Sequence, residues 1–453
     1  MRQSPAPEVF RDIEKQILRL TPPQVLVLSF LGLSLFGTLL LKLPAATQQP
    51  TSWMQALFTA VSASTVTGLA VVDTGTHFTQ FGQWVLLFLM QSGGLGLMTF
   101  GVFVIYLTNG QMTLRHRAAL REALNQTGPG DLRRVLISIF GFTAIMEIVG
   151  TALLALHWVP EMGWSRGLFY SFFHAVSAFN SAGFGLPGNS LTNYVGSPLV
   201  NSIISALFIT GGIGFVVLAD MLGKKRFRAY SLHTKLMLVG TLVINVVAML
   251  VILLLEHGNP ATLAALPDMG TRLWAAWFQA VSPRSAGFNT IDIGAMMPAT
   301  VFFMMGLMFI GGGSGSTAGG VKLSTFIVLL LATRAFLREQ ERPVVFGRSI
   351  PPNVILKALA ITVISLFCVM TGVFALMVTE GGGNFLDLAF EAVSAFGTVG
   401  LSRGVTAELS TAGQLVVILL MLIGRVGPLT LAFTLANVRR ERIQYPSGQL
   451  NVG

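Results

Sequence analysis

The chain contains 453 residues, of which 53% are hydrophobic and 11% are charged, a composition outside the range of soluble globular domains that indicates an integral membrane protein. Its net charge of +10 does not indicate a nucleic-acid-binding protein, because the basic residues form short clusters between apolar segments, as a topology signal does. The single cysteine, Cys368, excludes an intrachain disulfide and makes a thiol metal site implausible.

Eight apolar segments are long enough to cross a bilayer, which takes about 20 helical residues. In chain order they cover residues 24–43, 82–107, 135–156, 198–221, 235–255, 299–333, 354–378 and 413–437. A shorter apolar piece, too short to cross, lies between the two members of each consecutive pair and is typical of a re-entrant half-helix. The predicted fold class is an all-α integral membrane protein with eight transmembrane spans.

The four short pieces resemble one another. They read FTAVSASTVTGL from Phe58, FHAVSAFNSAGF from Phe173, FQAVSPRSAGF from Phe278 and FEAVSAFGTVGL from Phe390. Each contains a loop glycine at a nearly fixed offset, namely Gly68, Gly183, Gly287 and Gly400. A second mark, SGGLG, TGGIG, IGGGS or IGRVG, lies in the long helix after each copy. This recurrence predicts four pseudo-repeats of helix, half-helix with loop, and helix around one central pore.

The repeats divide the chain into six parts. These are a cytoplasmic N-terminal segment (1–23), four pore repeats (24–110, 111–221, 222–333 and 334–437) and a cytoplasmic C-terminal tail (438–453). Most Lys and Arg residues lie near the N-terminus, between consecutive repeats and in the tail. The positive-inside rule therefore predicts cytoplasmic termini and half-helices that enter from the outside.

Four half-helices around one axis can direct backbone carbonyl groups into a pore. Carbonyl oxygens can replace the hydration shell of a monovalent cation, and the negative ends of the half-helix dipoles favour it further. Glycine suits a backbone that crowds an ion or takes a positive φ. Close helix packing is an alternative role, which suits Gly93, Gly94, Gly211 and Gly212. It does not explain the offset of the loop glycines, so the pattern favours a cation pore.

The stretch GGGSGSTAGGVK, from Gly311 to Lys322, superficially resembles a phosphate-binding loop. Such a loop needs lysine directly after glycine, then Ser or Thr, between a strand and a helix. Here Val321 precedes the lysine, Leu323 follows it, and both flanks are apolar. The sequence therefore predicts no nucleotide bound by this chain's own motifs. It predicts instead a non-helical segment at membrane depth, which is tolerated where it faces protein or a water-filled cavity.

The loop sequences, the glycine-rich break and the arginine of IGRVG resemble the Trk/Ktr/HKT superfamily of cation transporters, most closely the bacterial Ktr-type membrane subunit. The resemblance covers about residues 24–437. It implies a multi-pass subunit of a potassium uptake system in the bacterial plasma membrane, with K+ transported and Na+ dependence open. It also implies a homodimer, a cytoplasmic nucleotide-binding regulatory subunit that forms a Rossmann-type ring, and membrane lipids as partners.

The resemblance further assigns a filter and a gate. The filter residues would coordinate K+ chiefly through carbonyls, and they are Val66, Thr67, Gly68, Ser181, Ala182, Gly183, Ser285, Ala286, Gly287, Thr398, Val399 and Gly400. Glycine in all four loops favours potassium, because sodium-selective plant members tend to carry serine in the first loop. The gate would be an intramembrane loop and one arginine, namely Gly311, Gly312, Gly313, Ser314, Gly315, Ser316, Thr317, Ala318, Gly319, Gly320 and Arg425.

Arg425 and Glu147 lie deep within predicted spans. Arg425 is roughly 18 Å from both interfaces, too deep for its side chain to snorkel. We expect it to form a barrier with the loop, to bond carbonyls of the broken helix, or both. For Glu147 we expect a structural role with hydrogen-bonded partners, because an unpaired carboxyl group is costly at this depth.

Two alternatives to the potassium pore remain. A sodium-permeable or weakly selective cation channel would use the same architecture, since loops of such varied sequence do not specify selectivity strictly. An intramembrane enzyme would need a recurrent ionisable pair that faces a cavity, whereas these repeats share glycines and small residues. No catalytic residues are therefore predicted.

Overall fold

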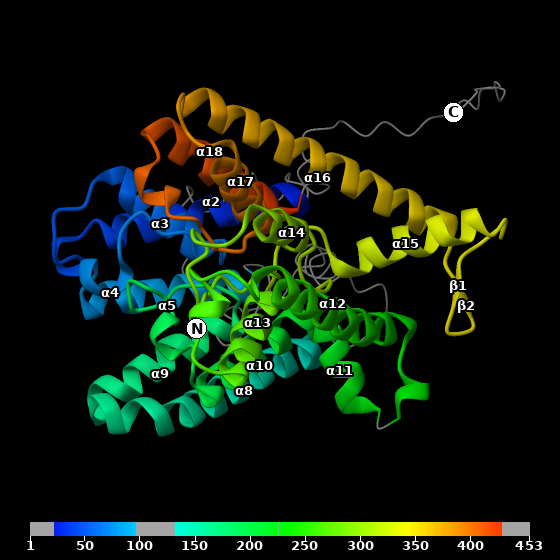
Figure 1. The fold of residues 1–453 in the computed structure, drawn as a ribbon, viewed down its shortest axis with the longest axis horizontal. Helices are drawn as coiled ribbons and strands as arrows, with labels where there is room; N and C mark the ends of the chain where they lie inside the picture. Colours follow the sequence, from blue (N-terminus) through cyan, green and yellow to red (C-terminus); the bar gives the residue numbers. More distant parts are fainter. Residues whose placement is uncertain (1–21, 97–131, 225, 428–453) are drawn as a thin grey trace, which may run out of the picture.

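The computed structural model describes residues 22–96, 132–224 and 226–427. Nearly all regular structure in these ranges is helical (Figure 1). The two named strands, β1 (Val344–Val345) and β2 (Arg348–Ser349), form a short antiparallel hairpin. The prediction of an all-α membrane protein is therefore confirmed, apart from this hairpin.

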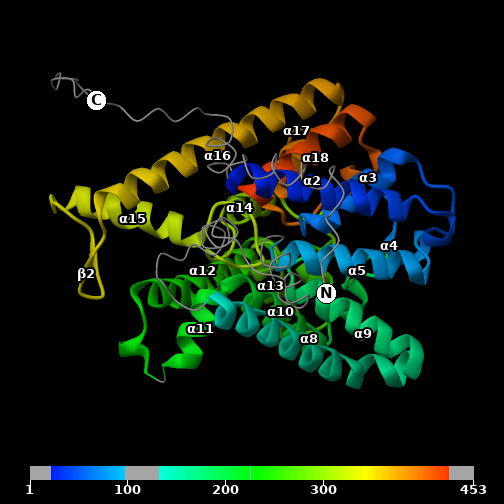
Figure 2. The ribbon, with the colours of Figure 1, turned by 180° about the vertical axis from the view of Figure 1, so that it is seen from behind.

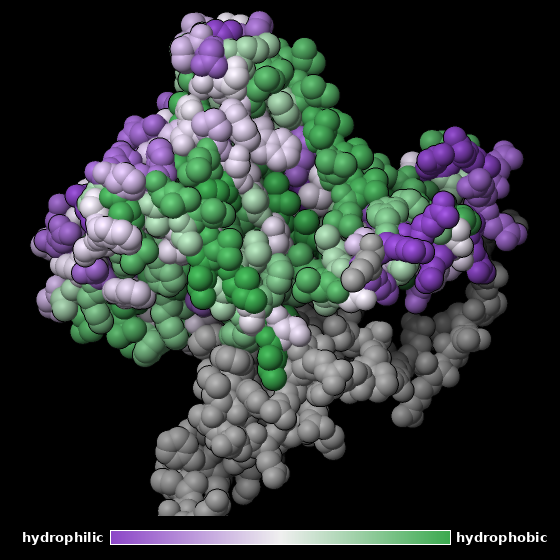
Figure 3. Space-filling view, turned by 90° about the horizontal axis from the view of Figure 1, so that it is seen from below, coloured by the Kyte–Doolittle hydropathy of each residue, from purple (hydrophilic) through white to green (hydrophobic). Residues whose placement is uncertain are grey.

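Four helices in the described ranges are by themselves long and apolar enough to cross a membrane. They are α2 (Pro22–Leu41), α8 (Leu132–Met162), α12 (Leu232–Glu256) and α16 (Pro352–Thr379). Each carries large exposed apolar side chains, among them Leu39, Leu156, Leu254 and Phe367. Figure 3 shows a broad apolar surface in the middle of the molecule, between polar side chains at its left edge and on the arm at its right. Such a surface suits contact with lipid rather than with water.

Three other predicted spans are shorter or divided in the structure. Helix α5 (Gln80–Gly94) and helix α18 (Thr411–Val426) both end close to the limit of the described residues, and the rest of their predicted spans lies outside them. Helices α14 (Pro298–Phe309) and α15 (Leu323–Leu337) flank the glycine-rich break, where the sequence places it. The N-terminal segment and the C-terminal tail also lie outside the described residues, apart from the start of α2.

The continuous span expected over 198–221 is not formed. The segment consists of α10 (Pro198–Ile213) and α11 (Phe215–Gly223), which meet at an angle of 94°. The bend lies at Gly214, whose φ of 110° is open to glycine but strained for other residues. Hydropathy alone could not predict it, because both halves are equally apolar.

Four shorter helices end at the loops predicted to form the filter. They are α3 (Trp53–Ser64), α9 (Trp164–Phe179), α13 (Met269–Val281) and α17 (Phe385–Gly397). Three have side-chain N-caps, which are Ser52, Asp268 and Asn384. At 1.5 Å per residue they are about 18 to 24 Å long, less than the roughly 30 Å of a hydrocarbon core. The remaining short elements are α4 (Thr74–His77), η1 (Pro44–Ala46), η2 (Thr192–Tyr194), η3 (Phe227–Ala229), η4 (Leu263–Ala265) and η5 (Val405–Glu408).

Each short helix packs against a helix from another part of the chain, and together these pairs form a closed ring. Helix α5 packs on α9, α10 on α13, α14 on α17, and α18 on α3. The last contact brings the C-terminal part of the described chain against its N-terminal part, as the orange-red and blue ribbons show (Figures 1 and 2). The carboxyl ends of all four short helices are buried inside this ring.

Three glycines allow α5, α10 and α18 to touch the carboxyl ends of the short helices that come before them in the chain. A Cβ on Gly93, Gly211 or Gly424 would overlap a carbonyl oxygen, of Ser64, Phe179 and Phe396 respectively. The expected close packing therefore holds at Gly93 and Gly211, and Gly94 is equally tight against the Asn180 side chain. At Gly212 that expectation is wrong, because a Cβ there has no neighbour within 4 Å.

The pair Gly211 and Gly212 provides a matched test of this packing. We expect Gly211→Ala to destabilise the protein by about 1–3 kcal/mol, because the added carbon forces α10 away from Phe179. Gly212→Ala on the same helix should leave stability unchanged or raise it by up to about 1 kcal/mol, through helix propensity. The apparent melting temperature in detergent measures both. Equal effects of the two substitutions would contradict this packing.

Candidate functional site

The four loops after the short helices have the same backbone shape. In each, the first residue has a positive φ, with values of 53° at Val66, 58° at Ser181, 64° at Ser285 and 46° at Thr398. The loop glycine two residues later is also positive, at 92°, 69°, 76° and 90° for Gly68, Gly183, Gly287 and Gly400. A positive φ is uncommon outside glycine and costly for β-branched residues such as Val66 and Thr398. Four occurrences at matching positions indicate a shared constraint on the loops.

The loops meet in a closed ring, in chain order. A Cβ on Gly68 would lie 2.5 Å from Ala182 O, one on Gly183 would lie 3.2 Å from Ala286 O, and one on Gly287 would lie 2.5 Å from Val399 O. A Cβ on Gly400 would overlap Thr67 O and so completes the circle. Each glycine is thus in contact with the carbonyl group that precedes the next glycine. The structure brings together all twelve residues that the sequence assigns to the filter.

A repeated hydrogen bond holds each loop on its short helix. The amide of the middle loop residue donates to a serine carbonyl of the A-V-S motif: Thr67 to Ser62 (2.8 Å), Ala182 to Ser177 (2.8 Å), Ala286 to Ser282 (2.9 Å) and Val399 to Ser394 (2.9 Å). The third bond spans one residue fewer, as expected from the shorter third motif. Main-chain carbonyls and helix carboxyl ends therefore converge at the ring, and both favour a cation.

The glycine-rich segment forms a loop closed at its neck. Ile310 and Val321 form a parallel bridge, the Gly311 amide donates to Val321 O (2.8 Å), and the Leu323 amide donates to Gly312 O (2.9 Å). The loop also follows the bend between α10 and α11. There the Gly313 amide donates to Gly212 O (2.7 Å), and the Phe215 amide donates to Gly315 O (3.0 Å). The loop and the bend are therefore one hydrogen-bonded unit.

This loop contacts the ring directly. Thr317 Oγ1 lies 3.1 Å from Ser181 Oγ, and it also contacts Phe179 O at 3.3 Å. A Cβ on Gly319 would overlap the side chain of Thr398. The predicted gate residues therefore lie against the second and fourth loops, with no space left for a larger side chain at Gly319.

Two cationic side chains bind the loop through its carbonyl groups. Arg425 donates to Thr317 O and to Gly93 O, and more weakly to Gly94 O (3.3 Å). Lys322 Nζ donates to Ala318 O at 2.6 Å. The expected bond from Arg425 to the broken helix is therefore present, and it extends to the carboxyl end of α5. No role in the gate was predicted for Lys322, although its place two residues after the last glycine was the available signal.

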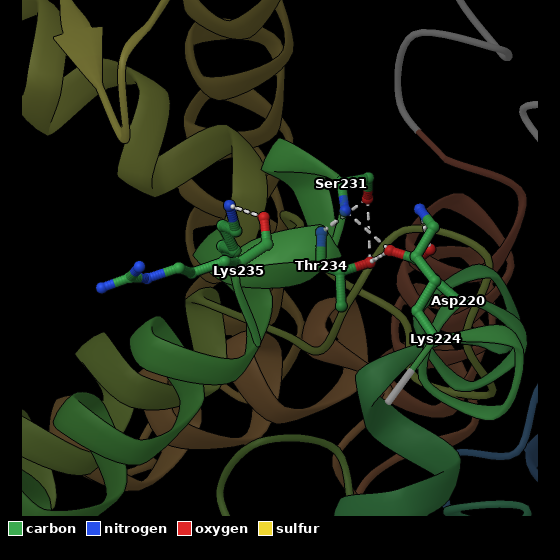
Figure 4. Close-up of polar contacts among 6 residues, drawn as sticks. Asp220, Lys224, Ser231, Thr234 and Lys235 are labelled. Atoms are coloured by element: carbon green, nitrogen blue, oxygen red, sulfur yellow. Dashed lines mark hydrogen bonds and ion pairs between the residues drawn. The ribbon is translucent and has the colours of Figure 1, made fainter. Parts of the chain in front are cut away.

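An acidic residue anchors the α11 side of the bend. Asp220, on α11, accepts hydrogen bonds from the Ser231 amide (2.8 Å) and Thr234 Oγ1 (2.7 Å), and it forms an ion pair with Lys224 (2.6 Å; Figure 4). Ser231 is itself the N-cap of α12. Asp220 therefore joins α11, and with it the loop, to the start of the next long helix.

A family model described as a cation transport protein, TrkH, matches residues 15–444. A Ktr system potassium uptake protein B from Bacillus subtilis is 51% identical over 436 residues, which cover 96% of this chain and 98% of that protein. Another protein of that name, from Vibrio alginolyticus, is 44% identical and covers 95% of each chain.

A more distant relative and a solved structure extend these similarities. The potassium/sodium uptake protein NtpJ from Enterococcus hirae is 37% identical and covers 96% of this chain and 98% of its own. The crystal structure of the potassium transporter TrkH from Vibrio parahaemolyticus matches with a TM-score of 0.72 at 20% identity. It covers 92% of this chain and 86% of that one, so the fold is shared over most of both chains.

The bend anchored by Asp220 can be tested without reference to transport. We expect Asp220→Ala to raise hydrogen exchange in α11 and in the first turn of α12 by about 5- to 10-fold, because it removes the acceptor for Ser231 and Thr234. Lys224→Ala is the control. It removes only an ion pair whose lysine is 43% exposed, so exchange should change less than about twofold. Similar exchange in both variants would contradict the anchoring role.

Proposed function

Since this chain belongs to the TrkH family of cation transport proteins, we propose that it is the ion-conducting membrane subunit of a potassium uptake system. The family consists of membrane transporters, so the chain is a multi-pass transport protein rather than an enzyme. Two relatives that align over almost their whole length are described as potassium uptake proteins. The choice of K+ as the transported ion in this proposal rests on the names of these relatives.

The observation that carries the proposal is the closed ring of four loops. Each loop contributes a glycine and the carbonyl of the residue before it, and four half-helices point their buried carboxyl ends at the ring. In our proposal, residues 66–68, 181–183, 285–287 and 398–400 coordinate K+ through these carbonyls. A dehydrated monovalent cation is the ligand that such a ring suits best, because the ring offers neutral oxygens and no carboxylate.

The gate in this proposal is the loop 311–320 together with Arg425. The loop packs against two of the four filter loops, and Arg425 bonds to its Thr317 carbonyl. A cation that leaves the filter would meet this loop and a fixed positive charge. Conduction then requires the loop to move, and Arg425 must release Thr317 for it to do so.

Permeability to sodium is the second candidate. One relative, NtpJ, is described as a potassium/sodium uptake protein at 37% identity. The middle and first residues differ among the four loops, so the ring is not fourfold identical. We favour potassium, because glycine occupies the third position of every loop and the most similar of the relatives cited are named for potassium alone.

The wider assembly is also a proposal. We propose four pseudo-repeats with eight spans, cytoplasmic termini and a homodimer that docks a ring of nucleotide-binding regulatory subunits. The word "system" in the relatives' names supports a second component, and the basic connections between repeats support the orientation. The closed packing of α18 on α3 supports one pore in each chain.

Potassium uptake into cells that lack their own uptake systems tests the filter. We expect Gly68→Ser, Gly183→Ser, Gly287→Ser and Gly400→Ser each to raise the KM for K+ by about tenfold, or to lower the preference for K+ over Na+ as strongly, because the new Cβ displaces a neighbouring carbonyl. Gly404→Ser is the control, since Gly404 has a φ of 99° but no neighbour within 4 Å. Wild-type affinity and selectivity in all four variants would disprove the filter assignment.

Shortening the loop tests the gate. Deletion of residues 314–318 should raise K+ flux several-fold and make it less dependent on a regulatory partner, because the obstruction is lost. Arg425→Ala should act in the same direction, and the two changes together should give less than the sum, since both relieve one barrier. Reduced flux in the deletion variant, with nucleotide bound by the purified membrane subunit alone, would instead indicate a phosphate site.

A further inference from the structure

A buried carboxyl group lies behind the second filter loop. Glu147, on the lipid-facing helix α8, is only 7% exposed. Its oxygens accept hydrogen bonds from Asn180 Nδ2 (3.0 Å) and Gln91 Nε2 (3.3 Å). Both donors are neutral amides, from α5 and from the end of α9. The expected hydrogen-bonded partners of Glu147 are therefore present, and one of them leads directly to the filter.

Asn180 is the residue that connects Glu147 to the loop. It caps the carboxyl end of α9 and directly precedes Ser181. Its side chain is fully buried and also donates to Gln91 Oε1 (2.7 Å). A Cβ on Gly94 would overlap this side chain, so α5 contacts Asn180 at Gly94 as well as at Gln91. The three side chains form a closed triangle, and any shift of Asn180 moves the adjoining filter backbone.

A related contact between the first helix and the end of the short helix occurs in two other predicted repeats of the chain. Ser34 on α2 contacts Ser64 at the end of α3, with 2.7 Å between the hydroxyl oxygens. Asn245 Oδ1 on α12 accepts from Arg284, which directly precedes Ser285, at 3.0 Å. In the second and third units a buried polar side chain of the first helix reaches the residue directly before the loop, whereas in the first unit it reaches Ser64, one residue earlier. A polar contact of this kind in three units indicates a role in holding the loops rather than a local accident of packing.

The fourth unit lacks this connection. The residue before Thr398 is Gly397, which has no side chain, and the buried hydroxyl of Ser365 on α16 bonds to Ile361 O of its own helix (2.7 Å). The Gly397 carbonyl accepts from Ser285 Oγ of the third loop instead (3.0 Å). Ser365 is therefore a matched control position: a buried hydroxyl on a first helix that does not reach a filter loop.

The triangle also lies next to the gate residues. Gln91 is within one turn of Gly93 and Gly94, whose carbonyls accept from Arg425. A short piece of α5 therefore lies between Glu147 and the arginine that holds the intramembrane loop. A change at Glu147 has two routes to the ion path, through Asn180 and through the end of α5.

We propose that Glu147 is a positioning residue of the filter, which fixes the second loop through Asn180 and so determines K+ affinity and discrimination against Na+. This inference rests on the proposed potassium function. Carbonyl ligands select an ion by their number and separation, so a displaced loop changes affinity before it changes the maximal rate. If Glu147 had only a structural role, its substitution would lower uptake in proportion to the loss of folded protein in the membrane.

The experiment measures K+ uptake, and its inhibition by Na+, in the full chain with its partner subunits, normalised to protein in the membrane. Glu147→Ala should raise the KM for K+ and weaken discrimination against Na+ by about 5- to 10-fold, with a smaller effect on the maximal rate. Glu147→Gln keeps an acceptor oxygen and should be intermediate. Asn180→Ala should reproduce Glu147→Ala, and the double variant should be no worse than the more affected single one.

Two control variants keep the outcome specific. Thr143→Val lies one turn from Glu147 on α8 and replaces a buried hydroxyl that bonds to no described group, and Ser365→Ala is the fourth-unit counterpart. Both should retain the wild-type KM and selectivity. If Glu147→Ala does not accumulate, Glu147→Gln and Asn180→Ala carry the test.

Failure of the positioning role and failure of the proposed function would give different results. Wild-type KM and selectivity in Asn180→Ala and in every Glu147 variant that accumulates would overturn the positioning role while leaving potassium transport intact. Equal shifts in Thr143→Val would also overturn it, since any change in α8 would then suffice. Absence of K+ uptake by the wild-type protein with its partner subunits would overturn the proposed function itself.

Discussion

The constraint on which the structure depends is the absence of a Cβ at four loop positions. Gly68, Gly183, Gly287 and Gly400 each touch the carbonyl group that precedes the next glycine. Four polypeptide loops can meet this closely around one axis only if each contact is backbone against backbone. The positive φ of each glycine is the second part of the same constraint, since other residues rarely adopt this backbone conformation.

The surrounding helices pack closely against this ring and support it. Gly93, Gly211 and Gly424 bring α5, α10 and α18 against the carboxyl ends of three short helices, which supports the loops. The same close contacts leave carbonyl groups at the end of α5 available, and Arg425 binds them together with Thr317 of the intramembrane loop. A buried cation is satisfied here by main-chain oxygens, which offsets part of its cost at membrane depth.

The four units are not equivalent, and the differences lie where a gate would act. Three loops are held from behind by a polar side chain of a long helix, whereas the fourth is held by the third loop and adjoins Gly319 and Gly320 of the intramembrane loop. The second loop is held by Asn180 and also contacts Thr317. In the proposed transporter, movement of the intramembrane loop is therefore transmitted to the second and fourth filter loops first.

The sequence alone determined the membrane class, the four short helices, the positions of the loop glycines and the break at residues 311–320, because each leaves a local mark in hydropathy, length or composition. It did not reveal the 94° bend at Gly214, the open space beside Gly212, the partners of Glu147, or the bond from Arg425 to Gly93 on α5. Those features depend on contacts between residues far apart in the chain, such as Arg425 with Gly93 and Glu147 with Asn180. Only the closure of the helices into a ring brings such pairs within hydrogen-bonding distance, and no local pattern records which carbonyl or amide a buried charge will meet.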